Sequence, residues 1–185
     1  LDCGMLAHNH QSLKKKLPDL LIVKPDWDYS FKEKQPEWFK AMTARPNLPK
    51  WFPKSDVFLW LDADCWVQKS STLNLLIEEA LNHDVVAIEE THPLYPLTYG
   101  DHPNNHVVED KVARRSIYSR YLTLKEVLSI EDYPMINCGV FAMRSDSPVW
   151  KKWHWAMKKN LKNAKGSLFF AEQTAFNLVL RSEDI

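Results

Sequence analysis

Apolar positions along the chain fall into short unbroken runs and into longer segments with helical spacing. Three runs have the length and the branched or aromatic content of buried strands, at residues 57–61, 85–88 and 136–143. Between the first two, apolar residues recur at helical spacing over residues 73–81. Two buried strands joined by a helix form a unit whose strands are parallel. The pattern therefore predicts an α/β fold with a mostly parallel (mixed) sheet and helices on both faces.

Further helices are predicted on either side of this unit from apolar spacing and cap residues. They cover residues 9–17, 36–43, 111–121, 147–161 and 171–180, and an additional strand is expected at residues 19–24. Residues 91–110 separate two of the predicted elements and contain three histidines and three prolines. A connection of that length is usually functional or disordered.

The composition is that of one ordinary globular domain. The 185 residues include 24 Lys and Arg and 24 Asp and Glu, so the net charge is zero with neutral histidine. This balance indicates no nucleic-acid partner. The sequence contains no apolar run long enough to predict a membrane segment, and its start is not that of a signal peptide. We therefore expect a cytoplasmic protein, unless a preceding segment carries an anchor or a signal.

Two aspartates close the first apolar run and are the first candidates for a functional site. Asp62 and Asp64 follow residues 57–61 with one alanine between them. Open α/β sheets bind ligands at the carboxyl ends of their strands, where these acids are predicted to lie. Two carboxylates this close repel each other, and Mg²⁺ or Mn²⁺ relieves the repulsion. The same pattern also fits a strand-end turn with two solvated aspartates.

Three further predicted elements carry polar residues at their ends or inside them. Two acids end the second strand, an Asn and a Gly interrupt the third, and an acid–Gln pair opens the last helix. These residues are Glu89, Glu90, Asn137, Gly139, Glu172 and Gln173. Glycine within a strand often marks close approach of a ligand, and the helix dipole favours an acid in the first turn. Taken singly, each also fits an ordinary strand end, β-bulge or helix start.

Taken together and in order, residues 45–64, 136–144 and 171–177 resemble a known family. The resemblance is to sugar-nucleotide-dependent glycosyltransferases of the GT-A fold, most closely glycosyltransferase family 8. The family pattern is an Arg, a proline-punctuated stretch, a strand and Asp-x-Asp, then Asn-x-Gly within a strand, then an acid–Gln pair opening a helix. The family also has an N-terminal strand–helix–strand unit and a late His ligand. We therefore expect residues 1–185 to form a single, partial GT-A-like domain.

The resemblance implies a metal-assisted donor site. Asp62 would contact the nucleotide ribose or the metal, and Asp64 would bind the metal, Mn²⁺ or Mg²⁺. Arg45 would reach the sugar or phosphate of the donor. The ion would neutralise the charge of the leaving nucleoside diphosphate.

The resemblance also implies a pocket for the reacting sugar. Glu89 would bond sugar hydroxyls, and Asn137 and Gly139 would line the pocket. Glu172 and Gln173 would lie beside the anomeric carbon. Either this pair or Glu89 would act catalytically, by supplying the electron-rich oxygen that helps an oxocarbenium-like transition state. Gln at that place is compatible with retention of configuration. We expect these groups to converge on a cleft near the first aspartate of the Asp-x-Asp motif.

The expected function is that of a glycosyltransferase, a hexosyltransferase using a nucleotide-sugar donor such as a UDP-sugar and a carbohydrate, lipid or protein acceptor. A nucleotidyltransferase on a similar sheet is one alternative, although that class usually begins with a Gly-rich phosphate loop and only four glycines occur here. A non-catalytic carbohydrate-binding or scaffold domain derived from the enzyme is the other.

Overall fold

The computed structural model describes residues 1–31, 33–90 and 106–182. Of the long connection expected at residues 91–110, the part before residue 106 lies outside the described residues. Two compact units can be distinguished along the chain, Leu1–Lys54 and Ser55–Ile185.

The first unit consists of short helices and extended chain. Its helices are α1 (Ala7–Lys16), α2 (Phe39–Ala44) and α3 (Leu48–Trp51), with a 3₁₀ turn η1 at Arg45–Asn47. The helices predicted at residues 9–17 and 36–43 are confirmed with shifted ends. The strand predicted at residues 19–24 is wrong, because that run forms no ladder and its Leu21 is 66% exposed.

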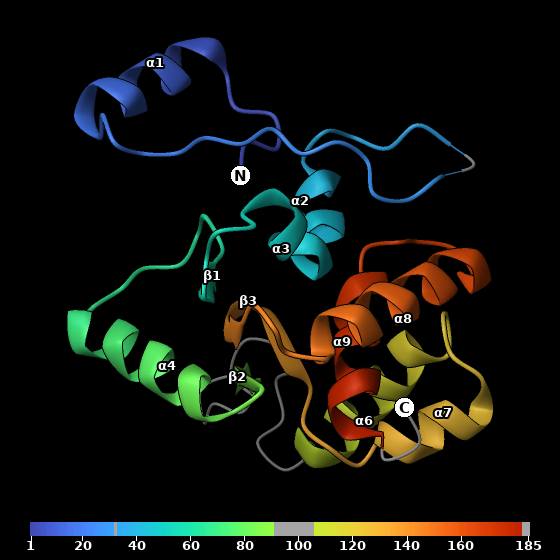
Figure 1. Cartoon of the computed structure of the whole chain (residues 1–185). Helices are drawn as coiled ribbons and strands as arrows, with labels where there is room; N and C mark the ends of the chain where they lie inside the picture. The colour runs from blue at the N-terminus through green and yellow to red at the C-terminus, as the bar shows by residue number, and fades with distance from the viewer. Residues whose placement is uncertain (32, 91–105, 183–185) are drawn as a thin grey trace. The chain divides into compact units, whose positions relative to one another are not determined.

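The second unit contains the remaining described elements (Figure 1). In chain order they are β1 (Val57–Leu61), α4 (Ser70–Asn82), β2 (Val85–Glu89), α6 (His106–Tyr118), α7 (Leu124–Ile130), β3 (Ile136–Arg144), α8 (Val149–Asn163) and α9 (Ala171–Arg181). The three predicted strands and the helix between the first two are confirmed. So are the last two predicted helices, within about two residues at each end, the usual uncertainty of helix boundaries.

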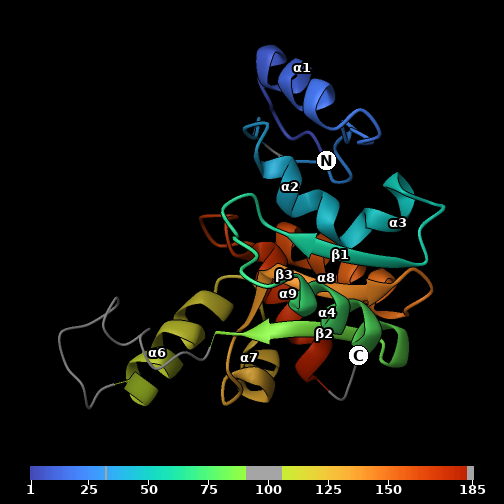
Figure 2. The same ribbon diagram turned by 90° about the vertical axis from the view of Figure 1, so that its left-hand side faces the viewer.

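Within the described residues the strands form one sheet in the order β1-β3-β2, and both neighbouring pairs are antiparallel. The prediction of a mostly parallel, GT-A-like sheet is therefore wrong. β1 and β2 do run in the same direction, because each is antiparallel to β3 (Figure 2). An apolar run specifies burial but not direction, and the strand that separates β1 from β2 comes much later in the sequence, after α6 and α7.

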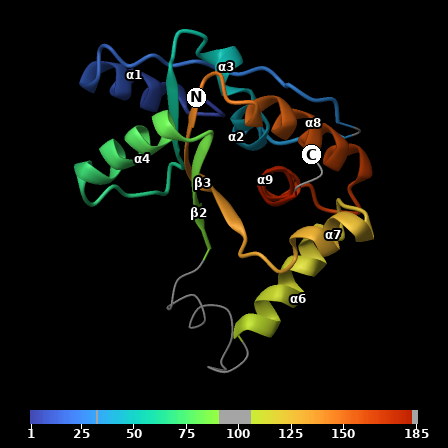
Figure 3. The ribbon, with the colours of Figure 1, turned by 60° about the horizontal axis from the view of Figure 1, so that its bottom comes forward.

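Helices cover both faces of this sheet, with α4 on one side and α8 and α9 on the other (Figure 3). Neighbouring residues of β3 point to opposite faces, as strand geometry requires. Ala142 packs with Leu76 and Ala80 of α4. Phe141 lies on the other face, with its ring 5.4 Å from that of Trp153 in α8. Burial of each large side chain of this kind contributes about 1.5–3 kcal/mol, so β3 is the centre of the apolar core.

A buried asparagine fixes α9 to the first residue of β3. The Asn177 side chain accepts a hydrogen bond from the Ile136 N–H (2.7 Å) and donates to the Ile136 carbonyl (2.9 Å). It also donates to the Gln173 carbonyl one turn earlier in α9 (2.8 Å). Ile136 is only 5% exposed, so water cannot replace these bonds. The amide therefore sets the distance between the start of β3 and the first turns of α9.

We expect Asn177→Ala to lower the free energy of unfolding by about 2–3 kcal/mol, because it leaves a buried N–H and C=O without partners. Urea denaturation followed by circular dichroism measures the change. Asn163→Ala at the exposed end of α8 is the matched control and should change the free energy by less than about 0.5 kcal/mol. Equal stability of the two variants would contradict the role of Asn177.

Candidate functional site

The ends of the three strands meet at one edge of the sheet. Since β1 and β2 run in the same direction, their carboxyl ends lie at the same edge as the start of β3. Backbone pairing continues past both strand ends. The Asp62 N–H donates to the Gly139 carbonyl (2.8 Å), and the Glu90 N–H donates to the Met135 carbonyl (2.7 Å). The acids that follow β1 and β2 are therefore held on either side of β3.

Asp62 is half-buried and its side chain is oriented by two neighbours. Trp60 donates its indole N–H to Oδ1 of Asp62 (2.7 Å). The Cys65 N–H donates to the Asp62 carbonyl (2.9 Å), which closes a turn that contains Asp64. Asp64 is exposed in this turn. One aspartate of the pair is thus fixed against the sheet, while the other faces solvent.

A bulge in β3 brings the Asn-x-Gly segment to this edge. Ala87 pairs with Phe141, but the next residue, Ile88, pairs with Asn137, so residues 138–140 lie outside the β2 ladder. The bulge is held by a local bond in which the Gly139 N–H donates to Oδ1 of Asn137 (2.5 Å). Bulges of this kind re-aim side chains next to functional sites.

Gly139 is needed here for space and not for an unusual backbone angle. A Cβ atom at this position would lie 2.7 Å from Oδ1 of Asn137 and 3.0 Å from Oδ2 of Asp62. The first distance is shorter than real Cβ contacts, and the second is at their lower limit. The missing side chain therefore lets the carboxylate that ends β1 and the amide in β3 approach the same point.

Glu90 joins this pair to α9. One of its carboxylate oxygens, Oε1, accepts from the Asn137 side-chain amide (2.9 Å) and from the Gln173 side-chain amide (3.0 Å). A continuous path of contacts thus runs from Asp62 through Gly139, Asn137 and Glu90 to Gln173. Among the expected site residues, the structure brings together the first aspartate, the Asn-x-Gly segment and the Gln of α9.

Tyr118 of α6 adds a neutral hydroxyl near this path. Burial raises the pKa of its phenol, nearby Arg114 opposes that shift, and the negative charge of Glu90 adds to it. The side chain is 1% exposed. The Tyr118 phenol is therefore harder to ionise than that of a free tyrosine, and its pKa is raised.

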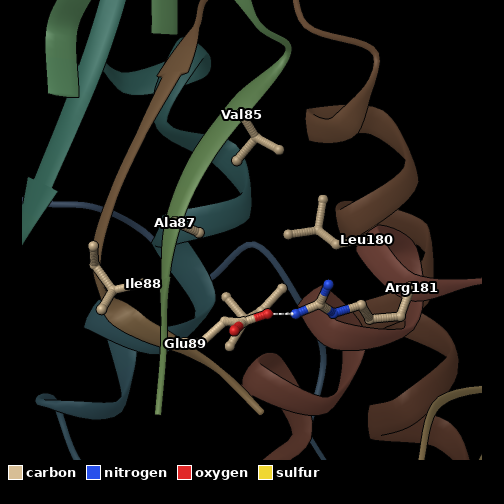
Figure 4. Close-up of a pocket in the computed structure, with 7 residues that line it drawn as sticks. Val85, Ala87, Ile88, Glu89, Leu180 and Arg181 are labelled. Atoms are coloured by element: carbon tan, nitrogen blue, oxygen red, sulfur yellow. Dashed lines mark hydrogen bonds and ion pairs between the residues drawn. The ribbon is translucent and has the colours of Figure 1, made fainter. Parts of the chain in front are cut away.

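Glu89, the acid that the family resemblance selects, lies elsewhere. It forms an ion pair with Arg181 at the end of α9 (Figure 4). Both residues line a pocket of about 600 Å³ beside β2. Its other lining residues are Val85, Ala87, Ile88, Ile136 and Leu180. Glu90, and not Glu89, bonds Asn137 and Gln173. The only sequence signal for this was the doublet of acids, because the bulge between them and the rest of β2 is not visible in the apolar pattern.

The remaining expected residues are not part of the path. Glu172 is 1% exposed, and its backbone carbonyl accepts from the Trp153 indole (3.1 Å), so it belongs to the packing of α9 on α8. Arg45 is 7% exposed and lies in η1 of the first unit.

Asp62 and Asp64 are the residues that could hold a metal ion. Within the described ranges, no three His, Cys, Asp or Glu side chains are grouped to bind one. Two carboxylates nevertheless fit the chemistry of Mg²⁺ or Mn²⁺, which are often held by one or two acids while phosphate oxygens and water complete the shell. The pair is thus suited to an ion that arrives with a phosphate ligand.

Comparison with family models, with curated proteins and with solved structures found no match. None of the described helices is both long and apolar enough to cross a membrane.

We expect Gly139→Ala to lower the free energy of unfolding by about 1–3 kcal/mol, because the new methyl group overlaps two side-chain oxygens. Thermal unfolding measures the loss. In an Asn137→Ala background the closer of the two overlaps disappears, so the same glycine substitution should cost less there. An equal cost in both backgrounds would show that the crowding does not come from Asn137.

Proposed function

We propose that this chain belongs to a metal-dependent glycosyltransferase that moves a sugar from a nucleotide-diphosphate sugar, such as a UDP-sugar, to an acceptor hydroxyl. The observation that carries the proposal is the path of contacts from Asp62 to Gln173. Its members come from four separate parts of the sequence, and three of those parts, all except the one with Glu90, resemble glycosyltransferase segments.

The aspartate side of the path suits a diphosphate. Asp62 and Asp64 would hold Mn²⁺ or Mg²⁺ together with the phosphate oxygens of the donor. When bound, the ion would neutralise charge on the leaving diphosphate. The exposure of Asp64 supports this role, because its carboxylate is accessible to an incoming complex. The hydrogen bond from Trp60 to Asp62 would keep the second carboxylate from turning away.

The amide side of the path suits a sugar. A sugar ring presents several hydroxyls that each need a fixed donor or acceptor. Asn137, Glu90 and Gln173 supply carboxylate and amide groups whose positions are set by bonds to one another. Gly139 lets Asn137 approach Asp62, so the groups proposed to hold the sugar lie next to the aspartate proposed to hold the metal. The proposed sugar and diphosphate sites are thus neighbours on the same sheet edge, as a nucleotide-sugar requires.

Asp64→Asn should weaken Mn²⁺-dependent binding of UDP by about tenfold or more, or roughly 1.4 kcal/mol, because one charged ligand becomes neutral. Isothermal titration calorimetry with UDP, with and without Mn²⁺, measures the effect. The unfolding temperature should not change, since the side chain is exposed.

Asp84→Asn is the control. Asp84 is also an exposed aspartate next to a strand, but it precedes β2 and therefore lies at the opposite edge of the sheet. The proposed donor site would be refuted if the wild type did not bind UDP. It would also be refuted if Asp64→Asn and Asp84→Asn bound UDP with the same affinity.

A further inference from the structure

The orientation of the Gln173 side-chain amide is determined by its partner. Gln173 donates from Nε2 to Oε1 of Glu90, and Asn137 donates from Nδ2 to the same oxygen. A carboxylate only accepts hydrogen bonds, so both amides must turn their NH₂ groups toward Glu90. Their carbonyl oxygens consequently point away from it.

The side-chain amide oxygens of Asn137, Asn177 and Gln173 differ in the hydrogen bonds that they accept. Oδ1 of Asn137 accepts from the Gly139 N–H, and Oδ1 of Asn177 accepts from the Ile136 N–H. Oε1 of Gln173 accepts no hydrogen bond from any residue that the structure describes. Of these three amide oxygens, that of Gln173 is the one available to a ligand. Gln173 itself is only half-buried.

We propose that Glu90 is a positioning residue that makes Gln173 present its amide oxygen, and not its NH₂ group, to the reacting sugar carbon. This inference rests on the proposed function. When the bond between C1 and the diphosphate breaks, positive charge develops on the sugar ring. An amide oxygen stabilises that charge, whereas the NH₂ group of a rotated amide would oppose it.

Both ends of the Glu90–Gln173 pair are fixed by separate backbone contacts. The Glu90 N–H bonds to the Met135 carbonyl, which extends the pairing of β2 with β3. The backbone carbonyl of Gln173 accepts a hydrogen bond from the Asn177 side chain, which is itself bonded to the backbone of Ile136. The geometry of the pair is therefore set by the sheet and by α9, which is the support that a positioned catalytic group needs.

A double-mutant cycle tests the inference. Glu90→Ala, which removes the oxygen that accepts from Gln173, is compared with Gln173→Ala, the double variant and the wild type for release of UDP from UDP-glucose, UDP-galactose and UDP-N-acetylglucosamine in the presence of Mn²⁺. In this assay water is the acceptor. Its oxygen bonds to C1 as the C1–O bond to UDP breaks, and the water proton passes to solvent.

Each single variant should lower kcat by about tenfold or more and change KM by less than about threefold, because the group acts in the transition state. The double variant should be no slower than the slower single variant, since Glu90 acts through Gln173. The inference would be overturned if the fall in kcat of the double variant equalled the product of the two single falls. It would also be overturned if the single variants changed KM alone.

Neighbouring acids provide the comparisons. Glu78→Ala, on the exposed face of α4, makes the same chemical change and should leave kcat as it is. A loss of kcat in Glu89→Ala but not in Glu90→Ala would assign the role to the other acid of the doublet and refute the proposal.

Glu90→Asp guards against misfolding of Glu90→Ala, which thermal unfolding would reveal. It keeps the charge but shortens the side chain, so the Gln173 amide is no longer held and kcat should again fall. Wild-type kcat in this variant would overturn the inference. A wild type that neither binds UDP with Mn²⁺ nor releases it from any donor would instead refute the proposed function itself.

Discussion

The antiparallel pairing of β3 with both β1 and β2 is the constraint on which the second unit depends. Each outer strand has β3 as its partner in the described part of the chain, and helices on both faces pack against β3 side chains. Because the two outer strands are both antiparallel to the same strand, they run in the same direction. The acids that end them are therefore placed at one edge.

The polar path at that edge combines rigid and accessible groups. The backbone bonds of Asp62 and Glu90 extend the ladders, and the bulge in β3 is closed by the Asn137 side chain. These contacts fix the groups that bond to one another. Asp64, next to one end of the path, is exposed, and Gln173 at the other end is half-buried, with a side-chain oxygen that accepts no hydrogen bond from the described residues. An arrangement of this kind is typical of sites in which supporting residues orient a few reactive ones.

Element positions could be predicted from the sequence because burial leaves a local periodic signal. The runs at residues 57–61 and 136–143 and the spacing in α4 each gave the right element. Strand direction could not be predicted, because a strand buried on both faces has the same apolar run whether its neighbours are parallel or antiparallel. β1 and β2 do run in the same direction, as the helix between them predicts, but no local feature shows that a later strand lies between them.

The candidate site was predictable to a similar degree. Asp62, Asn137 and Gln173 could be chosen from their positions at strand ends, inside a strand and at a helix start. That Glu90, and not Glu89, bonds Asn137 and Gln173 could not be predicted, because it depends on a bulge that shifts the register of β2 against β3. The burial of Glu172 was also not visible, since a helix start offers no sign of which first-turn residue faces the core.

The late position of β3 in the chain also bears on synthesis. The segments of β1 and β2 leave the ribosome well before the segment that pairs with both of them. Until β3 follows, two apolar strands have open edges and no ladder, the condition in which strands associate with other chains. Formation of the sheet is delayed further by the long loop that each pairing must close. Of the helices that pack on the sheet, α4 is synthesised before β3, and its Leu76 and Ala80 pack with side chains on one face of β1 and β2.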